Sequence, residues 1–140
     1  MAEESTTPDL VELTRRAIQS GAAGDVDATL SHYTSESVWD MSRVGLGEYT
    51  GVESIRRFVT DWISLYEELR VDVREVLDLG GCVTLAVVHM DGRLVGSTGH
   101  VAVDYASVVT WSDAAIVRAT HYNEIDEARA AAERLAEERA

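Results

Sequence analysis

The chain contains no lysine, since all 12 of its basic residues are arginine. Schiff-base chemistry and a lysine general base are therefore excluded. Its single cysteine, Cys82, excludes an intramolecular disulfide and fits a reducing compartment. Cys82 begins the apolar run Cys82–Val88, where we expect a buried thiol rather than a reactive one. No apolar run approaches the roughly 20 residues of a membrane span, and the acidic N-terminus is unlike a signal peptide. We therefore expect a cytoplasmic protein.

Positive charge is scarce, and the formal net charge is -13. Such a chain repels phosphate backbones and anionic membrane surfaces, so we expect neither nucleic acid nor membrane as a partner. With 140 residues, 46% of them apolar, the chain is long enough for one domain with a real core. It has no dinucleotide fingerprint, no phosphate loop, no nucleophile elbow and no histidines at metal-ligand spacing. We predict no cofactor and no metal.

The first half of the chain reads as helical, with one short strand. Residues 1–6 are expected to be disordered, and Thr7-Pro8 is typical of a helix start. A second, short helix is predicted from Val26 to about Tyr33, capped by Asp25. The stretch Ser37–Met41 is predicted to be a strand with Asp40 on one face and Trp39 on the other.

A long helix is predicted after Thr50, because Thr50 and Glu53 form a capping box in sequence. Apolar residues then recur at helical spacing, and this wide stripe must pack on a sheet or another helix. The stripe consists of Ile55, Phe58, Val59, Trp62, Ile63, Tyr66 and Leu69.

From Leu69 onward the hydrophobic period changes to two, which is typical of strands. The alternation slips near Glu75 and predicts a β-bulge there. Asp91-Gly92 is a two-residue hairpin signal. Tight turns between strands indicate an antiparallel meander, so we predict an α+β cone: a curved sheet with helices on one face and a pocket at the open end. The predicted strands are 69–79, 82–90, 93–111 and 114–122, followed by a helix capped by Asn123.

This order of elements resembles the nuclear transport factor 2-like superfamily, which includes ketosteroid isomerases and SnoaL-like polyketide cyclases. The likeness covers about residues 8–128. It implies a cone domain at residues 7–128, with residues 129–140 as the end of a C-terminal helix. It also implies an interior that binds small apolar molecules and a homodimer through the sheet. The residues that carry the likeness are Gly24–Ala28, Ser37–Asp40, Tyr49–Phe58, Val108–Ala119 and Thr120–Glu124.

The resemblance also implies site residues. The general-base Asp of ketosteroid isomerases corresponds to Asp40 here. The donors of their oxyanion hole correspond to Ser107 and to Arg16 or Ala17, so that hole is missing and we do not predict steroid isomerisation. On the last strand the resemblance places Tyr122 inward, with Thr120, Arg118 and Ile116. On the strand before it, Ser107 inward implies that Tyr105, Val109 and Trp111 share its face.

Asp40 and Arg118 then become candidates for one cavity. Either they form a structural ion pair, or Asp40 is a general base and Arg118 holds an oxyanion. His89 ends an apolar strand and is either a proton donor at the mouth or a partly exposed histidine. The outer sheet face, with Ala102, Ala106, Val108 and Thr110, is the predicted dimer contact.

The aromatic residues leave two interpretations open. Trp39 and Trp62 are either core or ligand platforms. The tyrosines at positions 33, 105 and 122 can each present a hydroxyl to the cavity, and a buried hydroxyl needs a partner. The other histidines are expected outside the cavity: His121 and His100 on the outer face and His32 on the second helix.

Three functions fit these observations. The first is a SnoaL-like enzyme that isomerises, cyclises or hydrates a small apolar substrate, with Asp40 as base and Tyr122, His89 and Arg118 as donors or orienters. Its ligand-binding residues would be Tyr33, Trp39, Trp62, Tyr105, Ser107 and Trp111. The second is a non-catalytic ligand-binding or dimerisation module. The third is epoxide hydrolysis by an Asp-Arg-Asp arrangement, of which Asp40 and Arg118 would be two members. For the second aspartate, Asp104 has the wrong parity along its strand, and the pattern does not fix the face on which Asp78 lies.

Overall fold

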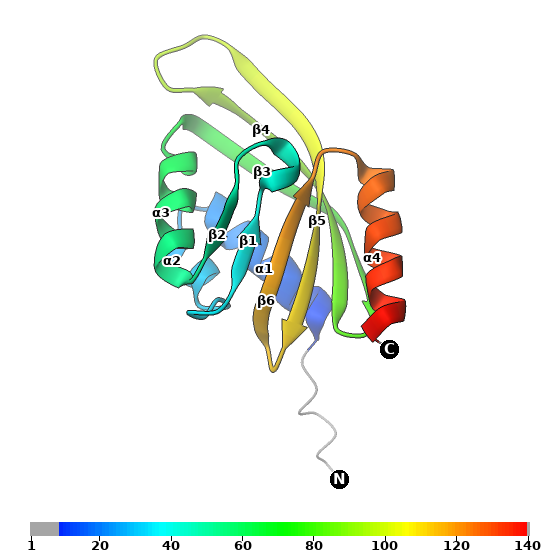
Figure 1. The fold of residues 1–140 in the computed structure, drawn as a ribbon. Helices are drawn as coiled ribbons and strands as arrows, with labels where there is room; N and C mark the ends of the chain where they lie inside the picture. The colour runs from blue at the N-terminus through cyan, green and yellow to red at the C-terminus, as the bar shows by residue number, and fades with distance from the viewer. Residues whose placement is uncertain (1–8, 140) are drawn as a thin grey trace.

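The computed structural model describes residues 9–139, which form four α-helices, one 3-10 helix and six strands. Figure 1 shows their arrangement. The predicted disorder at residues 1–6 and the predicted cap at Thr7-Pro8 lie outside the described residues. The elements are α1 (Leu10–Ala22), α2 (Val26–Leu30), β1 (Val38–Asp40), the 3-10 helix η2 (Ser42–Val44), β2 (Glu48–Thr50), α3 (Val52–Ile63), β3 (Tyr66–Gly80), β4 (Val83–Leu94), β5 (His100–Ser112), β6 (Ala115–Tyr122) and α4 (Ile125–Arg139).

The strands form one curved sheet in the order β2-β1-β6-β5-β4-β3 (Figure 1). Neighbouring strands are antiparallel, except that β1 runs parallel to β6. Strands β3 to β6 are consecutive in sequence and adjacent in space, as tight turns require. The predicted α+β class and the curved antiparallel meander are confirmed.

Helices cover both faces of the sheet, and this differs from the prediction of helices on one face. On the concave face, Ala17 of α1 packs with Val109 and Trp111 of β5. On the opposite face, the alanines of α4 at positions 128, 132 and 136 pack against Ala106 and Val108. The centre of the predicted dimer contact is therefore buried by α4, and a homodimer stays a prediction that needs another surface. None of the helices within residues 9–139 is long and apolar enough to cross a bilayer.

The helix boundaries follow from local capping chemistry. Asp25 caps α2 as predicted, because its carboxylate accepts from the amide of Ala28 at 3.0 Å. Asp9 caps α1 in the same way through the amide of Glu12. The predicted capping box at Thr50 is wrong: the N-cap of α3 is Gly51 with φ +90°, a conformation that glycine adopts at little cost.

The helix α3 is also shorter than its apolar stripe predicts. It ends at Ile63, and Tyr66 and Leu69 belong to β3 instead. Glu68 has φ +57°, and the register of β3 with β4 shifts between Glu67 and Arg70. This bulge lets residues three apart in sequence both face inward, which imitates helical spacing.

The predicted bulge near Glu75 is confirmed by the register shift between Val73 and Glu75, but the predicted hairpin at Asp91-Gly92 and the predicted burial of Cys82 are wrong. The chain does not reverse at Asp91-Gly92. Strand β4 continues to Leu94, and a Cβ on Gly92 would lie 3.3 Å from the Cα of Leu69, so the glycine permits close approach of β3. Cys82 is exposed in the β3–β4 turn with φ +63°, not buried in a strand.

Candidate functional site

A cavity of about 90 Å³ lies between the concave face of the sheet and the helices α1, α2 and α3. The helices contribute aliphatic and aromatic side chains and two threonines to its wall, and the strands contribute a tyrosine, a serine and a histidine besides apolar side chains. The lining residues are Thr14, Ala17, Ile18 and Gly21 of α1; Thr29 of α2; Tyr33; Trp39 of β1; Met41; Phe58, Val59, Trp62 and Ile63 of α3; Leu69 and Val71 of β3; Tyr105, Ser107, Val109 and Trp111 of β5; and Ile116, Ala119 and His121 of β6.

Aromatic rings form one wall of this cavity. Trp39 lies between Tyr33 and Phe58, with ring centroids at 5.9 and 6.1 Å. Trp62 contributes a further indole from α3. Rings at these separations attract each other edge to face or offset, so they hold a fixed wall. The predicted ligand-binding residues Tyr33, Trp39 and Trp62 therefore lie where a planar ligand could stack.

The floor of the cavity is fixed by a buried hydrogen-bonded chain. The indole of Trp111 donates to Oγ1 of Thr84 at 3.2 Å, and this oxygen lies 2.8 Å from Oγ1 of Thr14. All three side chains are at most 1% exposed. Because each polar atom has a partner, Trp111 is held in one orientation.

Two tyrosines that line the cavity have hydroxyls for which the described residues offer no hydrogen-bond partner. The hydroxyl of Tyr49 donates to the carbonyl of Leu46, but within residues 9–139 no hydrogen bond is made by the hydroxyl of Tyr33 or Tyr105. Burial raises the pKa of Tyr105 to about 12. Burial, with a smaller contribution from Tyr105, also raises the pKa of Tyr33. Both side chains therefore stay protonated and can donate to a ligand.

His121 faces this cavity, contrary to the prediction that it lies on the outer face. It pairs with Ser107 across β5 and β6, and its ring stacks on Tyr105 with centroids 4.3 Å apart. Burial lowers the pKa of His121, although a hydrogen bond with the side chain of Asn123 opposes this shift. The imidazole is therefore neutral at pH 7 and can accept a proton.

Asp40 lies on the opposite face of β1 from Trp39, outside the cavity lining. Its carboxylate accepts from Arg118 at 2.7 Å and from the amide and hydroxyl of Ser42 at 2.9 and 2.5 Å. Burial would raise the pKa of Asp40, but the bonds from Ser42 and the charges of Arg118 and Arg43 hold it below its ordinary value. The carboxylate is thus a satisfied anion in a structural pair.

A family model for the SnoaL-like domain matches residues 14–119. The chain belongs to the SnoaL-like domain family. No curated protein sequence matches it. Among solved structures, a protein with a ketosteroid isomerase-like fold from Catenulispora acidiphila, in complex with trimethylamine, is 16% identical, with a TM-score of 0.72 over 91% of this chain and 94% of that one.

Two further structures share the fold of this SnoaL-like domain. A protein proposed to be a SnoaL-like polyketide cyclase from Shewanella putrefaciens is 11% identical, with a TM-score of 0.72 over 90% of this chain and 96% of that one. TerC, co-crystallised with polyporic acid, is 16% identical, with a TM-score of 0.71 over 89% of this chain and 98% of that one. At such identities the likeness concerns the fold alone.

The other predicted catalytic residues of this SnoaL-like domain do not meet in the cavity. Tyr122 lies under α4 on the opposite face, where the guanidinium of Arg43 lies 4.6 Å above its ring. The side chain of Arg118 is 41% exposed and pairs with two carboxylates, Asp40 at 2.7 Å through Nη1 and Glu48 at 3.7 Å through Nη2. The second acid is a glutamate rather than the aspartate of the Asp-Arg-Asp arrangement that epoxide hydrolysis would use, and none of the three residues lines the cavity.

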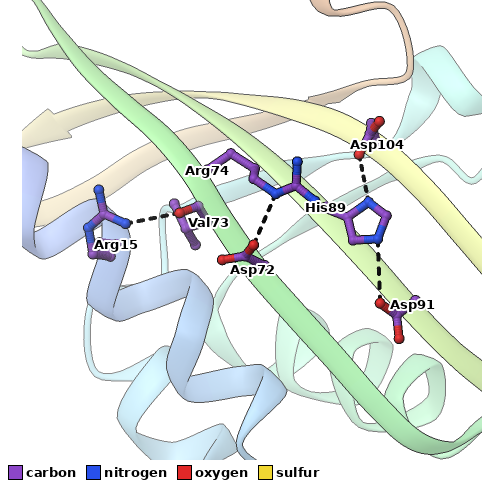
Figure 2. Close-up of polar contacts among 7 residues, drawn as sticks. All are labelled: Arg15, Asp72, Val73, Arg74, His89, Asp91 and Asp104. Carbon is purple, nitrogen blue, oxygen red and sulfur yellow. Dashed lines mark hydrogen bonds and ion pairs between the residues drawn. The ribbon is translucent and has the colours of Figure 1, made fainter.

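His89 also lies outside the cavity lining, on the outer face of β4 (Figure 2). Its Nδ1 is 2.7 Å from a carboxylate oxygen of Asp104, and its Nε2 is 3.4 Å from Asp91. His100, as predicted, is exposed near Asp91. No group of residues suited to hold a metal is found in the described part of the chain.

The remaining predicted positions divide between the two faces. Tyr105, Ser107, Val109 and Trp111 line the cavity, as the parity of β5 predicts. His32 is half-buried, with its ring edge-on to Trp111 at 6.0 Å, rather than exposed. His121 could have been found from the sequence if the register were known, because directly opposed residues of an antiparallel pair share a face.

Proposed function

We propose that the domain binds a small, uncharged and mostly apolar molecule in the cavity. One observation carries this proposal: among the described residues, the cavity lining contains aromatic rings and hydroxyls but no Asp, Glu or Arg. A charged ligand would lose its hydration there without gaining a counter-ion. An apolar ring would instead bury its surface against Trp39, Trp62 and Trp111.

The size of the cavity limits the ligand further. Its volume of about 90 Å³ is well below the 300–1,000 Å³ of sites for drug-sized molecules. A compound of one or two rings is therefore expected. The unpartnered hydroxyls of Tyr33 and Tyr105 favour a ligand with a hydrogen-bond acceptor such as a carbonyl oxygen.

The relatives support a role in holding small organic molecules. TerC was co-crystallised with polyporic acid, and the protein from Catenulispora acidiphila with trimethylamine. The geometry favours the ligand-binding interpretation over an enzyme that uses Asp40, because Asp40 is engaged by Arg118 and Ser42 outside the cavity.

The experiment compares three ligands of one shape by isothermal titration calorimetry: 2-indanone, indane and indane-2-carboxylate. We expect 2-indanone to bind most tightly, indane to bind about 2- to 10-fold more weakly for want of one hydrogen bond, and the carboxylate not to bind. Tyr105→Phe should reduce the difference between 2-indanone and indane. Tyr49→Phe, which lies outside the lining, is the matched control and should leave it unchanged. Binding of the carboxylate as tight as that of the ketone would refute the proposal.

A further inference from the structure

The cavity contains one group that can exchange a proton near neutral pH, and it is not a carboxylate. Among the described lining residues, the ionisable groups are His121, Tyr33 and Tyr105. The tyrosines stay protonated well above pH 7, since burial raises the pKa of each. The charged groups of the outer face, Asp40 and Arg118, lie on the other side of the sheet and bind each other.

The position of His121 suits proton transfer to or from a ligand. Its ring is stacked on that of Tyr105, with the centroids 4.3 Å apart and the ring planes inclined by 22°. Ser107 lies opposite it on β5. A ligand in the cavity would therefore have a neutral base beside it and two tyrosine hydroxyls to receive a developing negative charge.

We propose that His121 is the acid–base residue of the cavity and that it moves a proton at the carbon next to a carbonyl group of the bound ligand. In the first step a ring nitrogen of His121 takes the proton, the C–H bond breaks, and its electron pair forms a C=C bond. The π electrons of the carbonyl move onto oxygen, which accepts from Tyr33 or Tyr105. In the second step the imidazolium returns the proton to carbon. No other reactant is consumed, and the inference rests on the proposed function.

The test measures exchange of solvent deuterium into 2-indanone by NMR, with calorimetric binding of 2-indanone measured on the same samples. We expect the wild-type protein to accelerate exchange over buffer, and His121→Gln to lose about 100-fold or more of this acceleration while it still binds the ketone. His100→Gln, which replaces an exposed histidine, is the matched control and should exchange as fast as wild type. The wild-type rate should fall as the pH is lowered through the pKa of His121, which lies below its ordinary value of 6.5.

The outcomes separate the two proposals. If the protein binds 2-indanone but exchanges no faster than buffer, or if His121→Gln exchanges as fast as wild type, the acid–base role is wrong and the binding function stands. If neither 2-indanone nor indane binds, the proposed binding function is wrong, and the acid–base role that rests on it is wrong as well. A loss of exchange in His121→Gln that is accompanied by an equal loss of binding also overturns the proposal, since the histidine would then only shape the cavity.

Discussion

Arg118 donates to Asp40 across the parallel pair of β1 and β6 at 2.7 Å, on the face of the sheet opposite the cavity. Strand β1 has only three residues, so side-chain contacts contribute much of what attaches it to β6. Asp40 is 8% exposed, and its carboxylate also accepts two hydrogen bonds from Ser42. The pair therefore fixes the strand that carries Trp39 into the cavity.

Replacing Asp40 should consequently reduce the stability of the fold. We expect Asp40→Asn to lower the free energy of unfolding by about 1–2 kcal/mol, because charge-assisted hydrogen bonds are lost but Arg118 is partly solvated. Thermal denaturation and urea titration measure this. Asp61→Asn, an exposed acid on α3, removes the same charge and should change little. A variant of Asp40 that melts above wild type would instead indicate a charge retained for catalysis.

The same pair predicts how the difference in stability depends on pH. Because the folded-state pKa of Asp40 lies below 3.8, its contribution is fully present above that value and is lost as the pH falls through the folded pKa. The gap in unfolding free energy between wild type and Asp40→Asn should be constant from pH 5 to 8 and shrink below about pH 4. Urea midpoints across this range test the sign, and a gap that widens in acid would contradict it.

The fold was predictable because its signals are local and mutually consistent. Period-two alternation, tight turns and the Asp25 cap together indicated an α+β meander. The inward position assigned to Ser107 also predicted correctly which residues of β5 face the cavity. Which side chains of β6 face the cavity was not predictable, because the sheet is covered on both sides and the residues of both faces are partly apolar. Its register also shifts between Thr110 and Trp111, so Ile116 and His121 both face the cavity although their parity differs.

The sequence also could not decide whether the side chain of Asp40 faces the cavity. Alternation within β1 separated Asp40 from Trp39 correctly, but it could not decide which of the two faces the cavity. The partners that decide it, Arg118 on β6 and Ser42 on η2, come from tertiary pairing. The resemblance to ketosteroid isomerases assigned a role to the position without fixing the direction of the side chain.

The buried hydroxyl of Tyr105 is expected to strengthen ligand binding without stabilising the unliganded fold. Tyr105→Phe removes a buried hydroxyl that has no partner within the described chain, so the unliganded variant should be as stable as wild type or slightly more stable. The same variant should bind 2-indanone about 2- to 10-fold more weakly. Tyr49→Phe should behave in the opposite way, with lower stability and unchanged binding, because its hydroxyl donates to Leu46 at 2.7 Å. A Tyr105→Phe protein that unfolds well before wild type would show that a bond to this hydroxyl exists in solution.

The buried chain of Thr14, Thr84 and Trp111 gives the last prediction. Thr84→Val keeps the shape of the side chain but leaves the indole N–H of Trp111 and the hydroxyl of Thr14 without their partner. An unsatisfied buried donor costs about 1–3 kcal/mol, so we expect a lower urea midpoint at an unchanged slope. Thr84→Ser is the matched control, since it keeps the hydroxyl and loses only a methyl group. If Thr84→Ser loses as much stability as Thr84→Val, packing rather than hydrogen bonding holds Trp111 in place. If Thr84→Val alone is destabilised and also binds 2-indanone more weakly, the hydrogen bonds among these three side chains set the shape of the cavity floor.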